Sequence, residues 1–406
     1  MTNTGIRTGT FQSILLNSPS FTVIVQYFPQ EINLVVESSV AAASLNNPNS
    51  RSVLQNIIAL IASGSLSTDS ALQAVVNEFF GQSAAVLNSA LDLMQPSSYS
   101  AFAELQMEVA GQIVGMFHQG LFQRCHRIRP RSFWVEPFGD WYREQGVDFQ
   151  FGYTAQAKGI SAGFDGRFAD HWLLGVGGVY DWVNVRWYRP GSHAHVRNYY
   201  GTIYADYVTK RARIGATVMA GGDCYHVSRH IQFLATNETA RSNPRGFEMV
   251  GQLMGNFAFP VSCSWSVCPA FSLDYFYLRT TAFTEKNAPG LNLHVNRHNN
   301  HTGRGEVGLA GQYSYTYEAM KSCLFLQFAG TWIIEGALHR PDYIVRFQNQ
   351  SIPFKSRGWN RTLQLFSPSV EVQGTYLDFG ASLQYKAEIG PRFFGQAANL
   401  RLDYRW

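Results

Sequence analysis

The sequence predicts an all-β protein, a twelve-stranded antiparallel transmembrane β-barrel that follows an α-helical segment. Three observations predict this class. Charged residues make up only 15% of the 406-residue chain and aromatic residues make up 14%, whereas about 25% of a typical soluble domain is charged. Beyond residue 130, apolar and polar residues alternate in segments of strand length. The connections between those segments are alternately short and long, which is typical of transmembrane barrels.

Composition also excludes several other classes. The apolar and aromatic content is too high for an intrinsically disordered chain, and no window approaches the roughly 18 continuous apolar residues of a membrane-spanning helix. A net charge of +4 is too weak to favour nucleic acid as a partner. We therefore expect a protein that meets lipid with strands.

Aromatic residues divide the chain near Arg129-Pro130. Residues 1–130 contain ten aromatics and no Trp, whereas residues 131–406 contain forty-eight aromatics and all nine Trp. We predict a short β-rich segment at 1–48, a helical linker at 49–96, a long helix with the entry to the barrel at 97–130, and the barrel at 131–406. The first residues lack the charged and apolar regions of a secretory signal, so we expect a fragment, a misplaced start or an internal location.

The stretch that opens at Pro96-Ser97-Ser98 predicts a helix of about five turns. Its only charged residues are Glu104 and Glu108, and small residues recur along its length. The recurring small residues are Ala101, Ala103, Ala110, Gly111 and Gly115. Two interpretations fit this pattern: a core helix of a helical subdomain, or a slim helix enclosed within another structure.

After residue 130 the helical period is replaced by alternation. The last eight residues show this most clearly, because their even-numbered members are apolar and share one face of a strand. These members are Leu400, Leu402, Tyr404 and Trp406. The predicted strands are 133–142, 154–167, 172–186, 198–209, 213–229, 246–259, 265–284, 304–316, 323–335, 363–373, 378–388 and 396–406.

The connections decide between a barrel and a soluble β-sandwich. Those after even-numbered strands are short and those after odd-numbered strands are longer, and nothing would gather the short turns of a sandwich at one end. Aromatic residues at strand ends fit the two interfacial girdles of a membrane barrel. Examples are Trp172, Trp182, Trp187, Trp332 and Tyr207.

Five cysteines are an odd number, so at least one has no intramolecular disulfide partner. Cys263 and Cys268 are close enough in sequence to bridge a turn. Without a His at ligand spacing, the two do not indicate a zinc site.

Residues 85–406 resemble the translocator domain of the autotransporters, the type V secretion proteins. The resemblance begins with Leu87-Asn88-Ser89-Ala90-Leu91-Asp92-Leu93-Met94-Gln95-Pro96-Ser97-Ser98-Tyr99. It continues through Phe133-Trp134-Val135-Glu136-Pro137-Phe138-Gly139, Gly163-Phe164-Asp165-Gly166-Arg167-Phe168 and Leu174-Gly175-Val176-Gly177-Gly178-Val179-Tyr180. It ends in a last strand with an aromatic terminus. Cysteines in the barrel also resemble chlamydia-type polymorphic outer membrane proteins, whose Phe-x-x-Asn and Gly-Gly-Ala repeats are not visible here.

This resemblance implies a bacterial outer-membrane location and a helix that threads the barrel lumen. It implies export and cell-surface tethering of an N-terminal passenger, of which residues 1–48 would be a remnant. The implied partners are outer-membrane lipid, the outer-membrane barrel assembly machinery and, through the passenger, a host surface receptor. We expect a monomer without a cofactor.

Two groups of residues are assigned roles on this basis. Leu400, Leu402, Tyr404 and Trp406 resemble the terminal signal that the assembly machinery reads, and an unpaired last strand could join the machine by β-augmentation; an ordinary amphipathic strand is the alternative. Charged residues on the inward faces are predicted to grip the inserted helix. These lumen contacts are Arg304, Glu306, Arg401 and Asp403, with Glu104 and Glu108 on the helix.

Other functions require other constellations. A plain outer-membrane pore or surface adhesin barrel without a secretion role is the first alternative. An outer-membrane hydrolase is the second, with Asp223, His226 and His230 as candidates for its site. His294 and His298 with His301 could bind a metal only if their loop were helical, and no Gly-rich loop supports nucleotide binding. We therefore predict that the protein is not an enzyme and has no catalytic or metal site.

Overall fold

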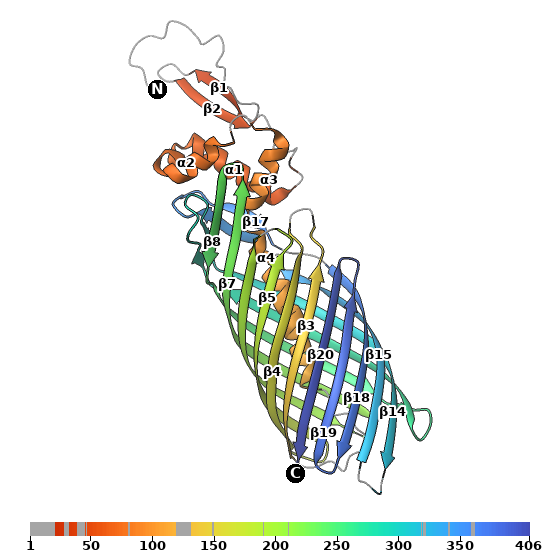
Figure 1. The fold of residues 1–406 in the computed structure, drawn as a ribbon. Coiled ribbons are helices and arrows are strands. Elements are labelled where there is room, and N and C mark those ends of the chain that lie inside the picture. Colours follow the sequence, from red (N-terminus) through yellow and green to blue (C-terminus); the bar gives the residue numbers. More distant parts are fainter. Residues whose placement is uncertain are drawn as a thin grey trace.

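The computed structural model describes residues 21–27, 32–38, 45, 47–79, 82–118, 131–147, 150–189, 191–209, 211–317, 319, 322–339, 342–358 and 362–406. Twelve strands within these residues form a closed antiparallel barrel (Figure 1). They are β3 (Arg131–Glu144), β4 (Tyr153–Arg167), β5 (Trp172–Trp187), β6 (His193–Val208), β7 (Ala212–Phe233), β9 (Arg245–Phe257), β11 (Trp265–Thr280), β14 (His298–Tyr317), β15 (Ser322–His339), β18 (Thr362–Tyr376), β19 (Phe379–Ile389) and β20 (Phe393–Arg405). The predicted fold class is confirmed.

The barrel closes between its first and last strands. β20 pairs with β3 from Phe393 opposite Glu144 to Arg405 opposite Ser132. Closure leaves no open sheet edge, which is the condition for a sheet to lie in hydrocarbon, where water cannot satisfy backbone N–H and C=O groups.

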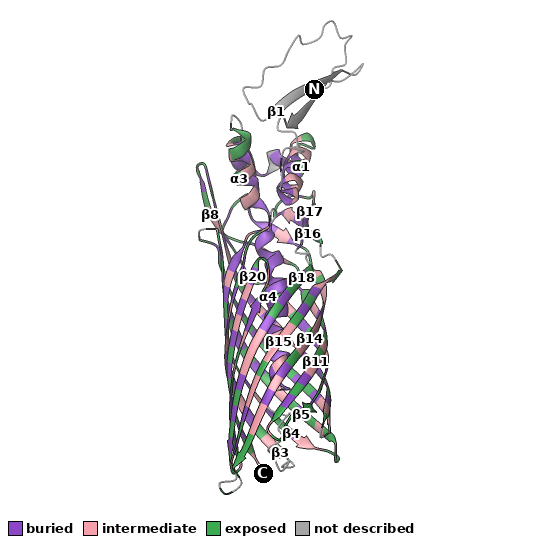
Figure 2. Ribbon diagram, turned by 90° about the vertical axis from the view of Figure 1, so that its right-hand side faces the viewer, coloured by how far each residue is buried: buried purple, intermediate pink, exposed green. Residues whose placement is uncertain are grey.

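The alternation in sequence sets the two faces of the wall. Outward side chains are apolar and exposed, as Ile203 at 62% and Leu402 at 52% show, whereas inward Asp206 and Arg401 are buried. Figure 2 shows this alternation of buried and exposed residues along the strands. The exposed side is therefore the lipid face.

Short turns and long connections lie at opposite ends of the barrel. The short turns span 168–171, 209–211, 258–264, 318–321 and 377–378, and they share the end of the barrel with the C-terminus (Figure 1). The helices of the amino-terminal part lie at the long-loop end. By the rule that outer-membrane barrels have short periplasmic turns, the long-loop end is the outer one.

Several strands extend farther toward the outer end than the sequence predicts, and β6 and β14 do so the most. β6 begins at His193 and not at 198, and β14 begins at His298 and not at 304. In the β14 extension polar residues lie on both faces, so the apolar–polar alternation that marks a strand is absent there. The prediction that residues 285–303 form a loop is wrong on this account.

Short strands fold above the outer rim. β8 (Thr236–Ser242) continues the β7 hairpin, and β12 (Phe283–Thr284), β13 (Leu293–Val295), β16 (Asp342–Phe347) and β17 (Phe354–Arg357) form a second sheet. β10 (Phe259–Pro260) pairs with β11 at the opposite end, and β1 (Phe21–Tyr27) pairs with β2 (Ile32–Ser38). The predicted connection 336–362 thus contains two strands.

Three helices and a 3-10 turn precede the lumen segment. They are α1 (Pro48–Ala62), η2 (Ser65–Thr68), α2 (Ser70–Asn77) and α3 (Ala84–Met94). Side chains of Asn47, Asp69 and Ser83 accept hydrogen bonds from backbone N–H groups of the first turns of α1, α2 and α3. Each N-cap satisfies a donor that the helix itself leaves unpaired.

These helices and the second sheet form a unit that we call the cap. The Asn49 side chain donates to the Arg357 carbonyl oxygen (3.2 Å) and accepts from the Arg357 N–H (2.7 Å), so α1 is joined to β17 through both backbone groups of one residue. Asn56 donates to the Ile352 carbonyl oxygen at 3.0 Å. Burial raises the pKa of Tyr343 in β16, which keeps its hydroxyl protonated as a donor to the Tyr99 carbonyl oxygen.

The fourth helix, α4 (Ser97–Met116), runs down the barrel lumen (Figure 1). It begins where the sequence predicts, and most of its residues are buried, including both of its carboxylates. The rest of the predicted helical segment, from 119 onward, lies outside the described residues. Among the residues that are described, no helix combines the length and apolar content needed to cross a membrane.

Candidate functional site in the barrel lumen

The lumen helix is slim on the side where the barrel wall comes closest. At Gly111, an added Cβ would lie 3.6 Å from Arg304 Nη1 and 3.6 Å from Phe276 Cζ. Small residues therefore allow the helix to lie directly against inward side chains of β11 and β14. Its polar side chains point into a wall that is itself polar.

Arg304 on β14 is the centre of the largest ion cluster in the described lumen. Its Nη1 lies 3.0 Å from Glu108 Oε2 on α4, and its Nη2 lies 2.6 Å from Glu388 Oε1 on β19. Its Nε lies 2.8 Å from Glu306 Oε1, and Nη1 is also 3.5 Å from Glu335 Oε2. One guanidinium thus joins the helix to β14, β15 and β19.

Because this cluster is buried, each of its charges depends on the opposite charges beside it. The Arg304 side chain is 2% exposed and that of Glu108 is fully buried. Lys386 Nζ adds a second cation 2.8 Å from Glu388 Oε1, so two cations face four carboxylates. Removal of one partner from a buried ion pair costs about 3–5 kcal/mol because the remaining charge has lost its compensation.

Farther around the helix, Gln106 contacts the wall through its side-chain amide. Gln106 Nε2 donates to Asn198 Oδ1 at 3.0 Å, and Asn198 Nδ2 donates to Asp181 Oδ1 at 2.8 Å. Tyr200 donates to Glu248 Oε2 at 2.9 Å. This chain of hydrogen bonds ties α4 to β5 and β6 on the side away from Arg304.

Carbonyls at the inner end of α4 are capped by side chains of the barrel as well as by backbone N–H groups of Phe117 and His118. The last turn of the helix contains no basic residue. Arg401 Nη1 donates to the Met116 carbonyl oxygen at 3.2 Å, and Arg213 Nη1 donates to the His118 carbonyl oxygen. Two guanidinium groups therefore satisfy carbonyls at the negative end of the helix dipole.

His118 extends this end contact to the carboxylate of Asp206. Asp206 Oδ1 accepts from Arg213 Nε at 2.8 Å and lies 3.1 Å from His118 Nδ1. Thr217 Oγ1 is in hydrogen-bond contact with His118 Nε2. The final described residue of the lumen segment is thus held by β6 and β7 through both ring nitrogens.

Aromatic rings surround the same inner end. Phe117 meets Trp134 edge-on at a centroid distance of 5.5 Å and lies 5.6 Å from the Tyr204 ring. Trp134 Nε1 donates to the Tyr204 hydroxyl at 3.1 Å, and Arg401 lies 4.3 Å above the Trp134 ring. The Trp134 ring covers Gly163 so closely that a Cβ there would overlap it. The ring therefore lies flat against the wall and leaves room for the helix.

The outer end of α4 is held by a buried ion pair beneath the cap. Arg229 Nη2 lies 2.5 Å from Glu285 Oε2, and Tyr99 donates to Glu285 Oε1 at 2.6 Å. Arg229 also donates to the carbonyl oxygens of Leu93 (2.8 Å) and Leu291 (2.9 Å). One arginine of β7 therefore joins the end of α3, the start of α4 and the outer loop.

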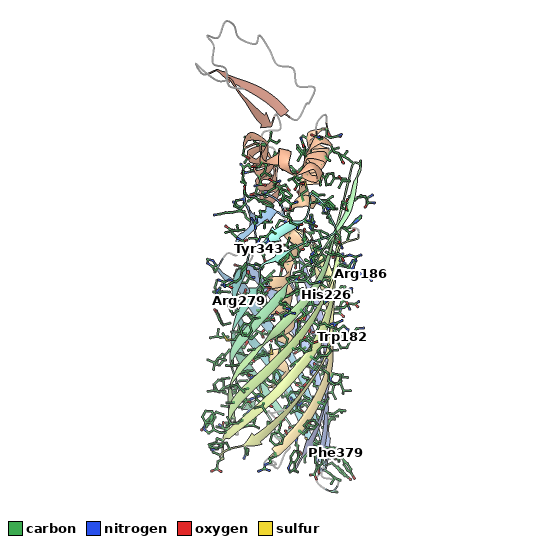
Figure 3. All side chains as sticks on the ribbon, turned by 90° about the vertical axis from the view of Figure 1, so that its left-hand side faces the viewer. Trp182, Arg186, His226, Arg279, Tyr343 and Phe379 are labelled. Atoms are coloured by element: carbon green, nitrogen blue, oxygen red, sulfur yellow. The ribbon has the colours of Figure 1, made fainter. Side chains whose placement is uncertain are left out.

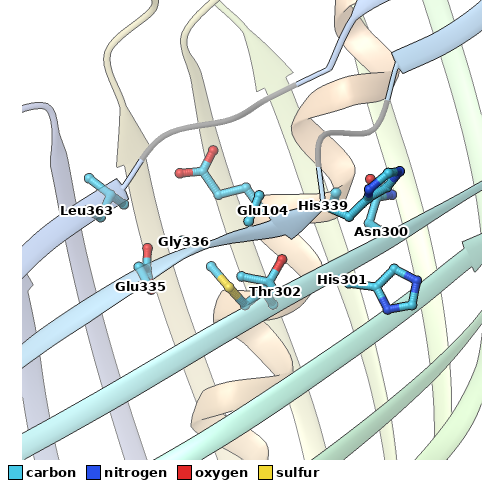
Figure 4. A pocket seen from close by; sticks show the side chains of 11 residues that line it. Glu104, Asn300, His301, Thr302, Glu335, Gly336, His339 and Leu363 are labelled. Atoms are coloured by element: carbon cyan, nitrogen blue, oxygen red, sulfur yellow. The ribbon is translucent and has the colours of Figure 1, made fainter.

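Two cavities show where the helix leaves space. A cavity of about 250 Å³ lies beside Gly115 and His118 and is lined by polar residues that include Gln252, Gln312 and Gln384. A second, of about 30 Å³, lies near the outer rim beside Glu104 (Figure 4), with room for a water molecule. Both cavities have polar and apolar residues in their lining.

Four of the predicted lumen residues meet at the helix, whereas Asp403 and Glu104 do not join those contacts. Arg304, Glu306 and Glu108 meet in one cluster, and Arg401 reaches the end of the helix. Asp403 instead pairs with Arg405 on its own strand at 2.5 Å. Glu104 faces the smaller cavity.

Sequence reasoning missed several contacts. These are His118, Asp206, Arg213, Arg229, Glu285 and Glu388. Alternation along β7 places Arg213 on the inward face, so the pattern identifies it as a lumen residue but not as a partner of the helix. Lys386 and Glu388 share the inward face of β19 at a spacing of two, which was the available signal for an ion pair.

Two other predictions need correction. Trp187 points inward against Phe102 at a centroid distance of 5.7 Å, so it is not part of the lipid-facing girdle. No disulfide joins Cys263 and Cys268, because Cys268 is buried and donates to Gln312 Oε1 while Cys263 is exposed in the turn.

The histidine segment is not helical. His294 lies 2.8 Å from Thr284 Oγ1, the His298 ring lies 4.2 Å from the Tyr343 ring, and His301 contacts Tyr275 at 2.6 Å. The helix-type metal arrangement is therefore not formed. Among the described residues no cluster of three metal-ligating side chains occurs.

The fold and the site define a class: an outer-membrane barrel whose lumen holds a helix of its own chain. Comparison with known proteins agrees. The family profile described as "Autotransporter beta-domain" matches residues 133–388. The chain is 19% identical to outer membrane protein A of Rickettsia conorii over 278 residues, which are 66% of this chain and 14% of that protein.

Two solved structures share the fold. The translocator domain of the autotransporter NalP from Neisseria meningitidis has a TM-score of 0.58 at 13% identity and covers 76% of this chain and 98% of its own. The β-domain of the Bordetella autotransporter BrkA has a TM-score of 0.52 at 15% identity and covers 68% of this chain and 100% of its own.

The chain belongs to the autotransporter β-domain family. Its location is the bacterial outer membrane. The chain spans about one seventh of the length of the Rickettsia relative.

The contact between Glu108 and Arg304 yields a prediction for a double-mutant cycle. We expect Arg304→Gln to destabilise the folded protein by about 3–5 kcal/mol, because four carboxylates lose their shared cation. Glu108→Gln should cost less, and the pair should show a coupling of about 1–3 kcal/mol. Urea unfolding in detergent micelles measures all four species.

A second cycle is the control. Arg213 contacts the helix at His118, ten positions and about 15 Å along the axis from Glu108, so Glu108→Gln and Arg213→Gln should be additive. Equal coupling in both cycles, or none in the first, would contradict a specific contact between Arg304 and the helix.

Proposed function

We propose that the barrel exports an N-terminal passenger through its lumen and that α4 then remains inside as the tether. The supporting observation is the path of the chain. β3 begins at the short-turn end, whereas the cap and the start of α4 lie at the long-loop end (Figure 1). Any polypeptide that precedes the cap is therefore joined to the barrel wall through the lumen.

The geometry of the tether supports retention after export. Basic residues of the barrel restrain the helix at three levels. Arg304 contacts it in the middle, and Arg213 and Arg401 contact its inner end. At the outer end Arg229 pairs with Glu285, which accepts a hydrogen bond from Tyr99 of the helix. Each contact is buried, where screening by salt is weakest. The helix is held at one depth, and the passenger stays attached to the cell surface.

The rival functions receive less support. A plain pore needs an open lumen, and α4 occupies it. The hydrolase would need Asp223, His226 and His230 on one face, but Asp223 faces the lumen while both histidines alternate to the outside of β7. We propose that the barrel itself performs no catalysis, and that any host surface receptor is bound by the passenger.

The path of the chain predicts which epitopes are accessible on cells. An epitope placed before residue 1, behind a signal peptide, should be cleaved by protease added to intact bacteria, because the chain leaves the lumen at the outer end. The same epitope inserted in the 168–171 turn should be cleaved only after the outer membrane is permeabilised. Immunoblotting with and without permeabilisation measures both.

Protection of the amino-terminal epitope on intact cells, in barrels that show heat-modifiable gel migration, would contradict the proposed direction of export. Cleavage of the turn epitope on intact cells would reverse the assignment of the two ends.

We further propose that the assembly machinery reads β20. Leu400, Leu402, Tyr404 and Trp406 all point outward and are exposed, and Tyr404 stacks on Trp406 at 5.7 Å. Before β20 pairs with β3, its edge is open and its aromatic end is accessible. An open edge of this kind can pair with a strand of the machine.

Substitution of these terminal rings should reduce assembly more than stability. We expect Tyr404→Ala with Trp406→Ala to lower the folded fraction in the outer membrane several-fold. The matched control is Leu383→Ala on β19, which is also outward and exposed at 55%. Equal assembly of the two variants in cells, by heat-modifiability of membrane fractions, would contradict a recognition role.

A further inference from the structure

The lipid face of the barrel carries a group of cations that the translocator function does not use. They lie on the outward faces of neighbouring strands from β4 to β11, toward the outer end. We call them the cationic patch. Its members are Lys158, Arg186, Arg197, Arg245 and Arg279 with His193, His195 and His226, and each side chain is exposed.

Strand register brings the members of the patch together. Arg186 is opposite His193 between β5 and β6, and His195 is opposite His226 between β6 and β7. Lys158 and Arg197 both face Trp182, one from each side. Neighbouring strands are about 4.8 Å apart, so these side chains form a continuous surface.

The patch lies at the depth of lipid headgroups. Figure 3 shows Arg186, His226 and Arg279 at similar heights above Trp182, with Phe379 at the opposite end of the barrel. Below the patch the outward side chains are apolar, including Ile160, Val176 and Ile203. Aromatic residues such as Trp182 mark the interface of hydrocarbon and water, so cations just beyond them are at the phosphate level.

The described strands of the barrel supply no anion to this surface. In the described strands of the barrel, no outward-facing position carries Asp or Glu. The charged neighbours that act on His195 are His193, His226, Arg186 and Arg197, all of them basic. Like charges this close repel one another, and an external anion would relieve that repulsion.

At the outer end, outward cations continue onto β3, whose Arg143 is exposed, and they do not extend to the other side of the described barrel. Among the described residues of β14, β15, β18, β19 and β20, no Lys or Arg faces outward. A barrel that bound any anionic membrane surface would be expected to carry cations around its whole rim. Cations on adjacent strands alone form a local site instead.

We propose that the cationic patch binds the phosphate groups of a phosphorylated lipid in the outer leaflet. The lipid's acyl chains would lie on the apolar strands below, and its phosphates would pair with the arginines above. Arginine suits this role because its planar fork binds phosphate oxygens in pairs. The occupant is a membrane lipid and not free phosphate, because the cations adjoin a lipid-facing wall.

The test measures lipid binding by the full chain in detergent micelles. The probe is hexa-acylated lipid A with two phosphates, titrated by native mass spectrometry. The variant is Arg186→Gln with Arg197→Gln. Loss of two cations near an anionic surface predicts roughly 30-fold weaker binding. The control is Arg131→Gln, an exposed and outward arginine at the opposite end of the barrel, which should bind as the wild type does.

Two further probes separate the sources of phosphate. A phosphate-free form of the same glycolipid should bind at least about 10-fold more weakly than lipid A, and inorganic phosphate at millimolar concentration should not displace lipid A. Equal binding of both glycolipids, equal binding by the double variant, or displacement by inorganic phosphate would each overturn the proposal. Heat-modifiable migration establishes that every variant is folded.

Discussion

The structure depends on one constraint: in lipid, every backbone N–H and C=O of the wall must bond to a neighbouring strand. Pairing of β20 with β3 meets that constraint by closing the sheet. Closure also directs every second side chain of the barrel strands into an enclosed lumen. Arg213, Arg304 and Arg401 are buried there. Those charges need partners that water cannot fully provide, and the chain supplies them by placing its own helix inside.

The helix and the wall are therefore complementary in a definite way. α4 brings carboxylates and terminal carbonyls, and the barrel brings guanidinium groups to Glu108, Met116 and His118. Because these contacts lie at separate levels along the axis, a shift of the helix by one turn would break all of them together. The cap adds a fourth restraint above the rim through Arg229. A translocator that retains its tether needs a fixed depth of this kind.

Much of the fold could be predicted from sequence, because lipid on one side and polar lumen on the other impose a period of two on every strand. The same period placed Arg304 and Glu306 on the inward face beside the helix. It failed at the outer end of β14, where polar residues lie on both faces, and at Trp187, whose ring packs inward against Phe102. The partnership of Arg213 with His118 could not be predicted, because helix depth and rotation are set by three-dimensional packing and leave no local period.

The central claim is that a helix held by buried charges closes the barrel. Ion conductance in planar lipid bilayers tests it most directly, with the full chain compared to a variant that begins at residue 119 and shows the same heat-modifiable migration. The account predicts a low conductance for the full chain and large, stable open steps for the shortened one. Equal conductance of the two proteins would contradict it.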